Sequence, residues 1–180
     1  LPVVNVRLED AAAYAAWVGR ALPTEAQWER AARGGVEGAR YPWGNEDPNP
    51  QRACFSLDPM VPGQPRAIGQ GQPNGLGLLD MAGNVAEWCR DRYQEGWYGK
   101  MPAADPVQEK TEEVRMIQVP AMGSDGVPTT VKASAPLRYA IVRGGSWASG
   151  ATELRVADRQ RQLLGSWDET IGFRLVSPAN

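Results

Sequence analysis

Histidine is absent from the 180-residue sequence. The imidazole ring is the commonest transition-metal ligand and the usual general base near neutral pH. Its absence excludes Ser-His-Asp and Cys-His catalysis. We therefore expect any metal site to use oxygen ligands, which favour calcium or magnesium.

Cysteines and long apolar runs are also scarce, and the chain carries no net positive charge. Cys54 and Cys89 are too few for a disulfide framework, although a single bridge between them stays open. A net charge of −2 gives no basic surface for nucleic acid. No apolar run reaches the ~18 residues of a membrane span, and no signal peptide is visible. We expect a protein that binds no nucleic acid, does not span a membrane and works in the reducing cytoplasm.

Turn residues are abundant, with 20 glycines and 15 prolines. One domain over residues 1–180 accounts for the length of the chain, which is sufficient to bury a core. Residues 99–137 differ in composition from the rest of the chain, because a charged, an apolar and a turn-like stretch follow one another. We predict that they form an insertion carrying a small hairpin.

The amino-terminal part predicts a strand followed by a helix. Residues 1–6 are mostly apolar and fit a short strand. Residues 9–19 place Ala12, Ala16 and Trp17 at helical spacing. This spacing predicts an amphipathic helix.

A second helix is predicted over residues 25–33. Thr24 is a favourable N-cap, and Gln27 three positions later completes a capping box. Gly34 follows the last helical residue, where glycine commonly ends a helix. Trp28 lies on the face of this helix that we expect to join the core.

Residues 34–77 read as one long loop, which is unusual in a compact domain unless a ligand or ion orders it. Its end carries an Asn74-Gly75-x-Gly77 turn, whose carbonyl and amide oxygens could face a hard cation. A plain turn is the other interpretation of this motif. Residues 85–89 then predict a buried strand.

The stretch 142–176 has firm ends and an irregular middle. Arg143-Gly-Gly-Ser-Trp147 opens it, and residues 172–176 close it with the alternation of a strand. The residues between lack the periodicity of a core helix or strand. A scaffold presents a binding loop in this way, although an ordinary surface connection is the alternative.

Six motifs together are specific to one family. They read LPTEAQWERAARGG (22–35), YPWGNE (41–46), NGLGLLDMAGNVAEWCRD (74–91), VRGGSW (142–147), LRVADR (154–159) and IGFRLV (171–176). In this order they resemble the formylglycine-generating enzyme (sulfatase-modifying factor) family. The resemblance implies an α+β, C-type-lectin-like fold with two helices, a short antiparallel sheet and much irregular loop.

The resemblance also implies how this chain departs from catalytic members. Those enzymes bind copper through two cysteines after the Gly-Gly-Ser motif, but this chain has no cysteine there and Ser149 stands at about the first position. A hydroxyl does not replace a thiolate as a copper(I) ligand. Related sulfoxide synthases use histidine-bound iron, which this chain cannot supply. We expect a non-enzymatic protein without copper or iron.

A structural calcium site does carry over by resemblance. The second calcium site of the family maps onto the side chain of Asn74, with the backbones of Gly75, Gly77 and Leu79 as partners. The other family site requires an asparagine where this chain has Cys54, so we do not expect it.

Some relatives with this fold are the variable proteins of bacterial and phage diversity-generating retroelements. By resemblance, residues 142–176 would be a variable region whose framework is held by Trp147, Arg155 and Phe173. This implies a changeable surface for an unidentified protein or other macromolecule. The expected ligand contacts are Ala148, Ser149, Gly150, Ala151, Thr152, Asp158, Arg161, Leu163, Leu164, Ser166, Trp167 and Asp168.

Three alternatives stay open. The apolar members of that set, Leu163, Leu164 and Trp167, could belong to the core. The fold could also host altered chemistry, with Glu153 or Asp158 as the acid. Finally, the chain could be a regulatory or sensor domain of a larger protein.

Overall fold

The computed structural model describes residues 1–58, 60–104, 106–109, 114–122, 124, 126–136 and 138–177. Its centre is a sheet in the order β5-β4-β1-β6. The strands are β1 (Ala86–Arg92), β4 (Tyr139–Arg143), β5 (Gln160–Leu163) and β6 (Ile171–Gly172). Strand β4 runs antiparallel to both β1 and β5, whereas β6 is parallel to β1. The α+β class is confirmed, but the sheet is mixed, not purely antiparallel.

Helix α1 (Leu8–Trp17) lies near the predicted position but presents a different face. Its buried residues are Leu8, Ala11 and Ala15, while Trp17 is 81% exposed. The predicted face of Ala12, Ala16 and Trp17 is therefore wrong. Alanine is too small to mark which side of a helix is buried, so the sequence pattern was ambiguous.

Helix α2 (Glu25–Arg33) matches the prediction at both ends. The Thr24 hydroxyl accepts the Gln27 N–H, and the Gln27 side chain accepts the Thr24 N–H. Gly34 ends the helix in the left-handed conformation at φ 62°. Trp28 is 1% exposed, which confirms its role in the core.

The two helices cover opposite faces of the sheet. On one face, Leu8 and Ala11 of α1 pack with Trp88, Val142 and other apolar residues. On the other face, Trp28 and Ala32 of α2 pack with Cys89 and Ile141 among others. The alternation of side chains along β1 and β4 thus supplies one core to each helix.

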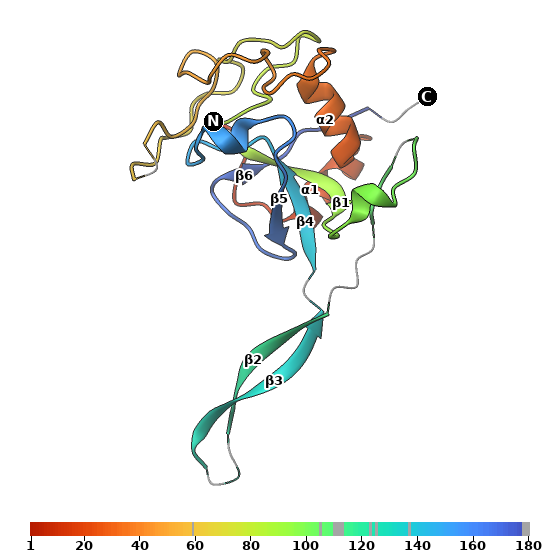
Figure 1. The fold of residues 1–180 in the computed structure, drawn as a ribbon, viewed down its shortest axis with the longest axis vertical. Helices are drawn as coiled ribbons and strands as arrows, with labels where there is room; N and C mark the ends of the chain where they lie inside the picture. Colours follow the sequence, from red (N-terminus) through yellow and green to blue (C-terminus); the bar gives the residue numbers. More distant parts are fainter. Residues whose placement is uncertain are drawn as a thin grey trace.

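The remaining two strands, β2 (Val114–Met122) and β3 (Pro128–Pro136), pair antiparallel with each other. They project from the rest of the molecule (Figure 1). This hairpin lies where the sequence predicts one. Residues 105, 110–113, 123, 125 and 137 of the predicted insertion lie outside the described residues.

Two predicted strands differ from the structure. Residues 1–6 form no strand, and Asn5 has a left-handed backbone at φ 57°. After β6, extended pairing stops until Val176, which forms an isolated bridge with Ala21. Residues 85–89 do overlap β1, as predicted.

The long loop from residue 34 is ordered by side chains that bond to the backbone. The carboxylate of Asp80 accepts the N–H groups of Gly69 and Gly71. The amide of Asn84 accepts the Arg66 N–H and donates to the Arg66 carbonyl, at 3.0 and 3.2 Å. These bonds replace strand and helix ladders, so buried backbone groups are satisfied without regular structure.

Both cysteines are free thiols. Cys89 is fully buried, and Cys54 is half-buried with its sulfur 3.0 Å from the carbonyl oxygen of Gln64. Burial raises the pKa of each thiol. Within the described part of the chain, no helix is long and apolar enough to cross a membrane.

Candidate binding surface

The two halves of the predicted ligand surface lie at opposite ends of β4. Residues 148–152 follow Arg143, the last residue of β4. Leu163, in contrast, pairs with Tyr139, the first residue of β4. The chain therefore presents two separate patches: one formed by residues 148–152 and one formed by residues 163–168.

Part of the 148–152 patch is held by hydrogen bonds within the protein. The Ser149 hydroxyl accepts the Ser146 N–H at 3.0 Å, and the Ser149 carbonyl accepts the Ser56 N–H at 2.9 Å. Gly150 is half-buried, whereas Ala148, Ala151 and Thr152 are exposed. Only the side chains of these last three are open to solvent; the backbones of Ala148 and Thr152 bond to the side chains of Ser146 and Arg155.

The 163–168 patch exposes large side chains on a fixed backbone. Leu163 is 43% exposed and Trp167 is 58% exposed. The carbonyl of Leu163 accepts both the N–H and the hydroxyl of Ser166, at 3.2 and 2.6 Å. The carbonyl of Asp168 accepts the Asn5 N–H at 3.1 Å. The side chains at positions 163, 166 and 167 can therefore differ without loss of the backbone bonds that hold the turn; only the bond of the Ser166 hydroxyl is lost on substitution.

Leu164 differs from its neighbours, because it is half-buried and packs against the core on the α1 side. Its N–H donates to the Arg138 carbonyl at 2.9 Å. We assign it to the scaffold. Alternation along an extended chain, which turns every second side chain inward, would have identified it.

Between the patches lie Asp158 and Arg161. Asp158 is 3.8 Å from the Arg155 guanidinium and takes a hydrogen bond from Gln160. Burial raises the pKa of Asp158. It contacts structural partners and no nucleophile in the described chain, so its geometry gives no support to the predicted enzymatic alternative.

Arg161 belongs to a stack of arginine and tyrosine side chains. Its guanidinium carbon lies 4.9 Å from the centre of the Tyr139 ring and 5.2 Å from that of Tyr93. Arg159 also lies over Tyr93, at 4.9 Å from the ring centre, and over Tyr98, at 4.6 Å. Such cation–π contacts fix the planes of both guanidinium groups.

A buried ionic cluster, which sequence reasoning missed, supports this stack. Glu25 is 3% exposed and pairs with Arg143 at 3.3 Å and Arg159 at 2.8 Å. The Tyr98 hydroxyl donates to the same carboxylate at 2.9 Å. Arg143 is fully buried and reaches Glu29 at 2.5 Å. A charged residue at the end of the apolar run of β4 was the signal in the sequence.

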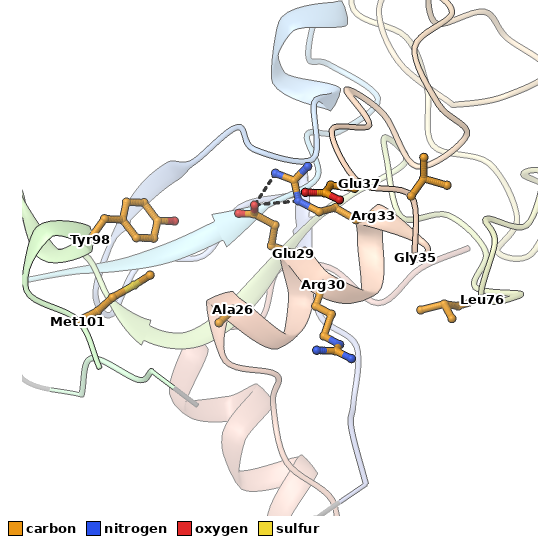
Figure 2. Close-up of a pocket in the computed structure, with 10 residues that line it drawn as sticks. Ala26, Glu29, Arg30, Arg33, Gly35, Glu37, Leu76, Tyr98 and Met101 are labelled. Atoms are coloured by element: carbon orange, nitrogen blue, oxygen red, sulfur yellow. Dashed lines mark hydrogen bonds and ion pairs between the residues drawn. The ribbon is translucent and has the colours of Figure 1, made fainter. Parts of the chain in front are cut away.

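The outer side of α2 forms the floor of a groove of about 550 Å³ (Figure 2). Tyr98 and Met101 lie near the amino-terminal end of the helix and Leu76 near its carboxy-terminal end. Arg30 points away from the ion pair of Glu29 and Arg33. Tyr98 therefore joins this groove to the buried cluster below it.

The Asn74 turn is held by the side chain of Asn74 itself. Its amide nitrogen donates to the carbonyls of Ala31 and Ala32 at the end of α2. Its oxygen accepts the N–H groups of Leu76 and Leu78, at 3.0 and 3.1 Å. Ligation of calcium by this oxygen would require it to exchange those bonds for the ion. Calcium held by Asn74, Gly75, Gly77 and Leu79 stays a prediction.

Comparison with known proteins gives one family and several relatives. Residues 1–179 match the model of the Sulfatase-modifying factor enzyme 1-like domain. Inactive C-alpha-formylglycine-generating enzyme 2 of Mus musculus is 42% identical over 199 residues, which cover 99% of this chain and 50% of that protein. The formylglycine-generating enzyme of Streptomyces coelicolor is 34% identical, over 99% of this chain and 53% of that enzyme.

A further similar protein is named as a kinase. Serine/threonine-protein kinase pkn1 of Chlamydia pneumoniae is 38% identical over 179 residues, 99% of this chain and 24% of the kinase. The chain thus spans between about a quarter and about half of the length of these relatives.

Among solved structures, Treponema denticola variable protein 1 is similar in fold. The TM-score is 0.62 at 26% identity, over 88% of this chain and 48% of that one. The similarity to variable proteins that the sequence motifs indicate is therefore confirmed in the structure.

Proposed function

Because this chain belongs to the sulfatase-modifying factor enzyme 1-like family, as the match over residues 1–179 shows, we propose that it is a non-catalytic, ligand-binding member. Two relatives support a non-catalytic role: inactive C-alpha-formylglycine-generating enzyme 2 and Treponema denticola variable protein 1. Formylglycine-generating enzymes match as well, so the role depends on the surface that this chain presents.

The observation that carries the proposal is the 163–168 patch. Leu163 and Trp167 are exposed, yet the backbone beneath them bonds to Arg138, Ser166 and Asn5. A few side chains, among which tryptophan is enriched, carry most of the binding energy in protein interfaces, and Trp167 is of this kind. The ligand in this proposal is a protein or another macromolecule.

A display experiment tests the proposal. The chain is displayed on yeast with positions 163, 166 and 167 randomised, and the library is selected against a panel of unrelated proteins. Binders that retain a folded domain and lose binding on return to alanine at 163 and 167 are the expected result. A library in which most members fail to fold would contradict it.

The catalytic alternative has a direct test, because catalytic relatives match the chain. The purified protein is incubated with copper(I), oxygen, a thiol reductant and a cysteine-containing sulfatase-type peptide, and the peptide mass is measured. We expect no conversion of cysteine to formylglycine. Conversion at a rate above that of the buffer would overturn the non-catalytic proposal.

A second candidate role is a regulatory domain within a longer polypeptide. The similarity to pkn1 covers 24% of that kinase, which is the observation that favours it. The complete gene decides this role, since a regulatory domain predicts a kinase or another signalling domain in the same reading frame.

A further inference from the structure

Arg161 lies on the part of the sheet face that α2 leaves uncovered. It pairs with Ile141 in the β4–β5 ladder, and Leu163 pairs with Tyr139. Paired residues share a face, so all four side chains point to the side on which α2 packs. Ile141 is fully buried there, whereas Arg161 and Leu163 are exposed. At the Tyr139 end of β4, this face of the sheet is therefore no longer covered by α2.

The guanidinium of Arg161 is held by two aromatic rings and has no anionic partner in the described part of the chain. The rings of Tyr93 and Tyr139 hold it at 5.2 and 4.9 Å. It makes no hydrogen bond or ion pair with the described residues. Arg143, Arg159 and Arg174 each meet a carboxylate at 2.5 to 2.8 Å. Arg161 is therefore an oriented, exposed cation that no described residue pairs with.

The two acids that the structure describes beside this stack, Glu25 and Asp91, are already engaged. Glu25 is shared by Arg143, Arg159 and Tyr98. Asp91 accepts the N–H groups of Glu25 and Gln108, at 2.7 and 2.9 Å. Neither carboxylate is available to Arg161, so its charge is uncompensated within this cluster.

The side chains around Arg161 favour one chemical class of anionic ligand. A planar guanidinium fork matches a carboxylate in a bidentate manner, and stacking on rings reduces the entropy lost on binding. The exposed Leu163, two positions along the same face, offers an apolar contact beside it. The net charge of −2 disfavours polyanionic partners such as nucleic acid or an anionic membrane.

We propose that Arg161, stacked between Tyr93 and Tyr139, is a recognition site for the carboxylate of an acidic side chain on a protein partner, with Leu163 contacting an adjoining apolar residue. This assignment rests on the proposed binding function and names the chemistry of its ligand. It adds Tyr93 and Tyr139 to the surface as positioning residues.

The test is a titration followed by nuclear magnetic resonance, with the Arg161 side-chain N–H and the Leu163 amide as reporters. The probe is the peptide acetyl-Leu-Glu-amide, and acetyl-Leu-Gln-amide is the neutral control. We expect saturable, salt-sensitive binding of the glutamate peptide in the millimolar range, with the glutamine peptide weaker by roughly tenfold. The variant Arg161→Lys keeps the charge but loses the fork, and should weaken binding by a similar factor.

Arg30 supplies the matched control. It is an arginine on α2 that stacks on no aromatic ring and makes no ion pair with the described residues, so Arg30→Lys should leave the affinity unchanged. Equal chemical-shift changes of the Arg30 and Arg161 side-chain N–H signals on addition of the glutamate peptide would overturn the proposal. The absence of a chemical-shift change at Arg161 would overturn it as well. Inorganic phosphate that binds more tightly than the glutamate peptide would also overturn it, by assigning the site to phosphorylated or lipid groups.

The outcome is separable from that of the proposed function. If randomised surfaces yield binders but Arg161→Lys has no effect on the peptide titration, only the carboxylate assignment fails. Unchanged thermal unfolding of Arg161→Lys confirms that any loss of affinity is local.

Discussion

Arg143 is fully buried and contacts the carboxylates of both Glu25 and Glu29. Glu87 is engaged in the same manner, because it accepts the Trp28 indole N–H at 2.6 Å and two N–H groups of Arg174. Several partners for each ion offset the cost of taking it out of water. Removal of one partner leaves a charge uncompensated in the interior. These residues therefore fix how α2 sits on the sheet.

Replacement of Glu87 by alanine should reduce the free energy of unfolding by about 2–4 kcal/mol. The variant leaves the Trp28 indole and the Arg174 guanidinium without their acceptor. Urea denaturation followed by tryptophan fluorescence measures the change. Glu46→Ala is the control, because Glu46 is 66% exposed and lies 3.7 Å from Arg52. The control should differ from the parent by less than about 0.5 kcal/mol; equal losses in the two variants would contradict the account.

Tyr98 should give the protein a loss of stability in strongly alkaline solution. Burial, and then the charge of Glu25, raise the pKa of Tyr98 from 10.0 to about 12. Between these values the unfolded chain loses the phenol proton and the folded chain keeps it. The contribution of this group is therefore complete below pH 10 and is lost as the pH rises towards 12. The alkaline ultraviolet titration of Tyr98→Phe should lack this late phase; a late phase that persists in the variant would refute the assignment.

At the scale of elements, α2 was predictable and α1 was only partly so. The capping box of Thr24 and Gln27 and the left-handed Gly34 are local signals, and local signals defined both ends of α2. The buried face of α1 is the side that packs on the sheet. In an alanine-rich helix the residue types do not indicate which side that is. The parallel pairing of β6 with β1 joins residues far apart in sequence, so no local pattern encodes it.

The candidate surface shows the same limit. Exposure of Leu163 and Trp167 agrees with the sequence interpretation of an irregular connection. The separation of the two patches by β4 and the arginine–tyrosine stack arise from pairing between distant strands. Tyr93 contacts both Arg159 and Arg161, whereas Tyr98 contacts only Arg159 and Tyr139 only Arg161; this arrangement appears only in the fold.

The junction of α2 with the Asn74 turn should be intolerant of a methyl group. A Cβ at Gly75 would overlap with the carbonyl oxygen of Gly34, whereas a Cβ at Gly77 meets no atom within 4 Å. Gly75→Ala should therefore cost at least about 2 kcal/mol, through displacement of the backbone. Gly77→Ala should cost about 1 kcal/mol, for its left-handed conformation at φ 75° alone. Thermal unfolding of both variants ranks them; a more severe effect at Gly77 would contradict the close approach.

At the scale of the whole molecule, the β2–β3 hairpin stands apart from the two cores (Figure 1). Among the residues of β2 and β3 whose burial the structure describes, Gln118, Pro120, Met122 and residues 128–130 are exposed, and Ala121 is half-buried. A flexible Gly-Ser linker in place of residues 110–137 should therefore leave the midpoint of thermal unfolding within about 4 °C of the parent, the effect of ~1 kcal/mol in a domain of this size. Circular dichroism checks this, and a large loss of stability would show that the hairpin supports the fold.

The separation of frame from surface is the central claim, and a pair of multiple variants measures it. The variant Leu163→Ala/Ser166→Ala/Trp167→Ala removes three side chains of the 163–168 patch. The variant Leu154→Ala/Val156→Ala removes side chains that are each 1% exposed. Calorimetry should place the unfolding midpoint of the first within about 3 °C of the parent and that of the second at least about 8 °C lower. A first variant that unfolds as early as the second would show that residues 163–167 are core, and the account of a changeable surface on a rigid frame would be contradicted.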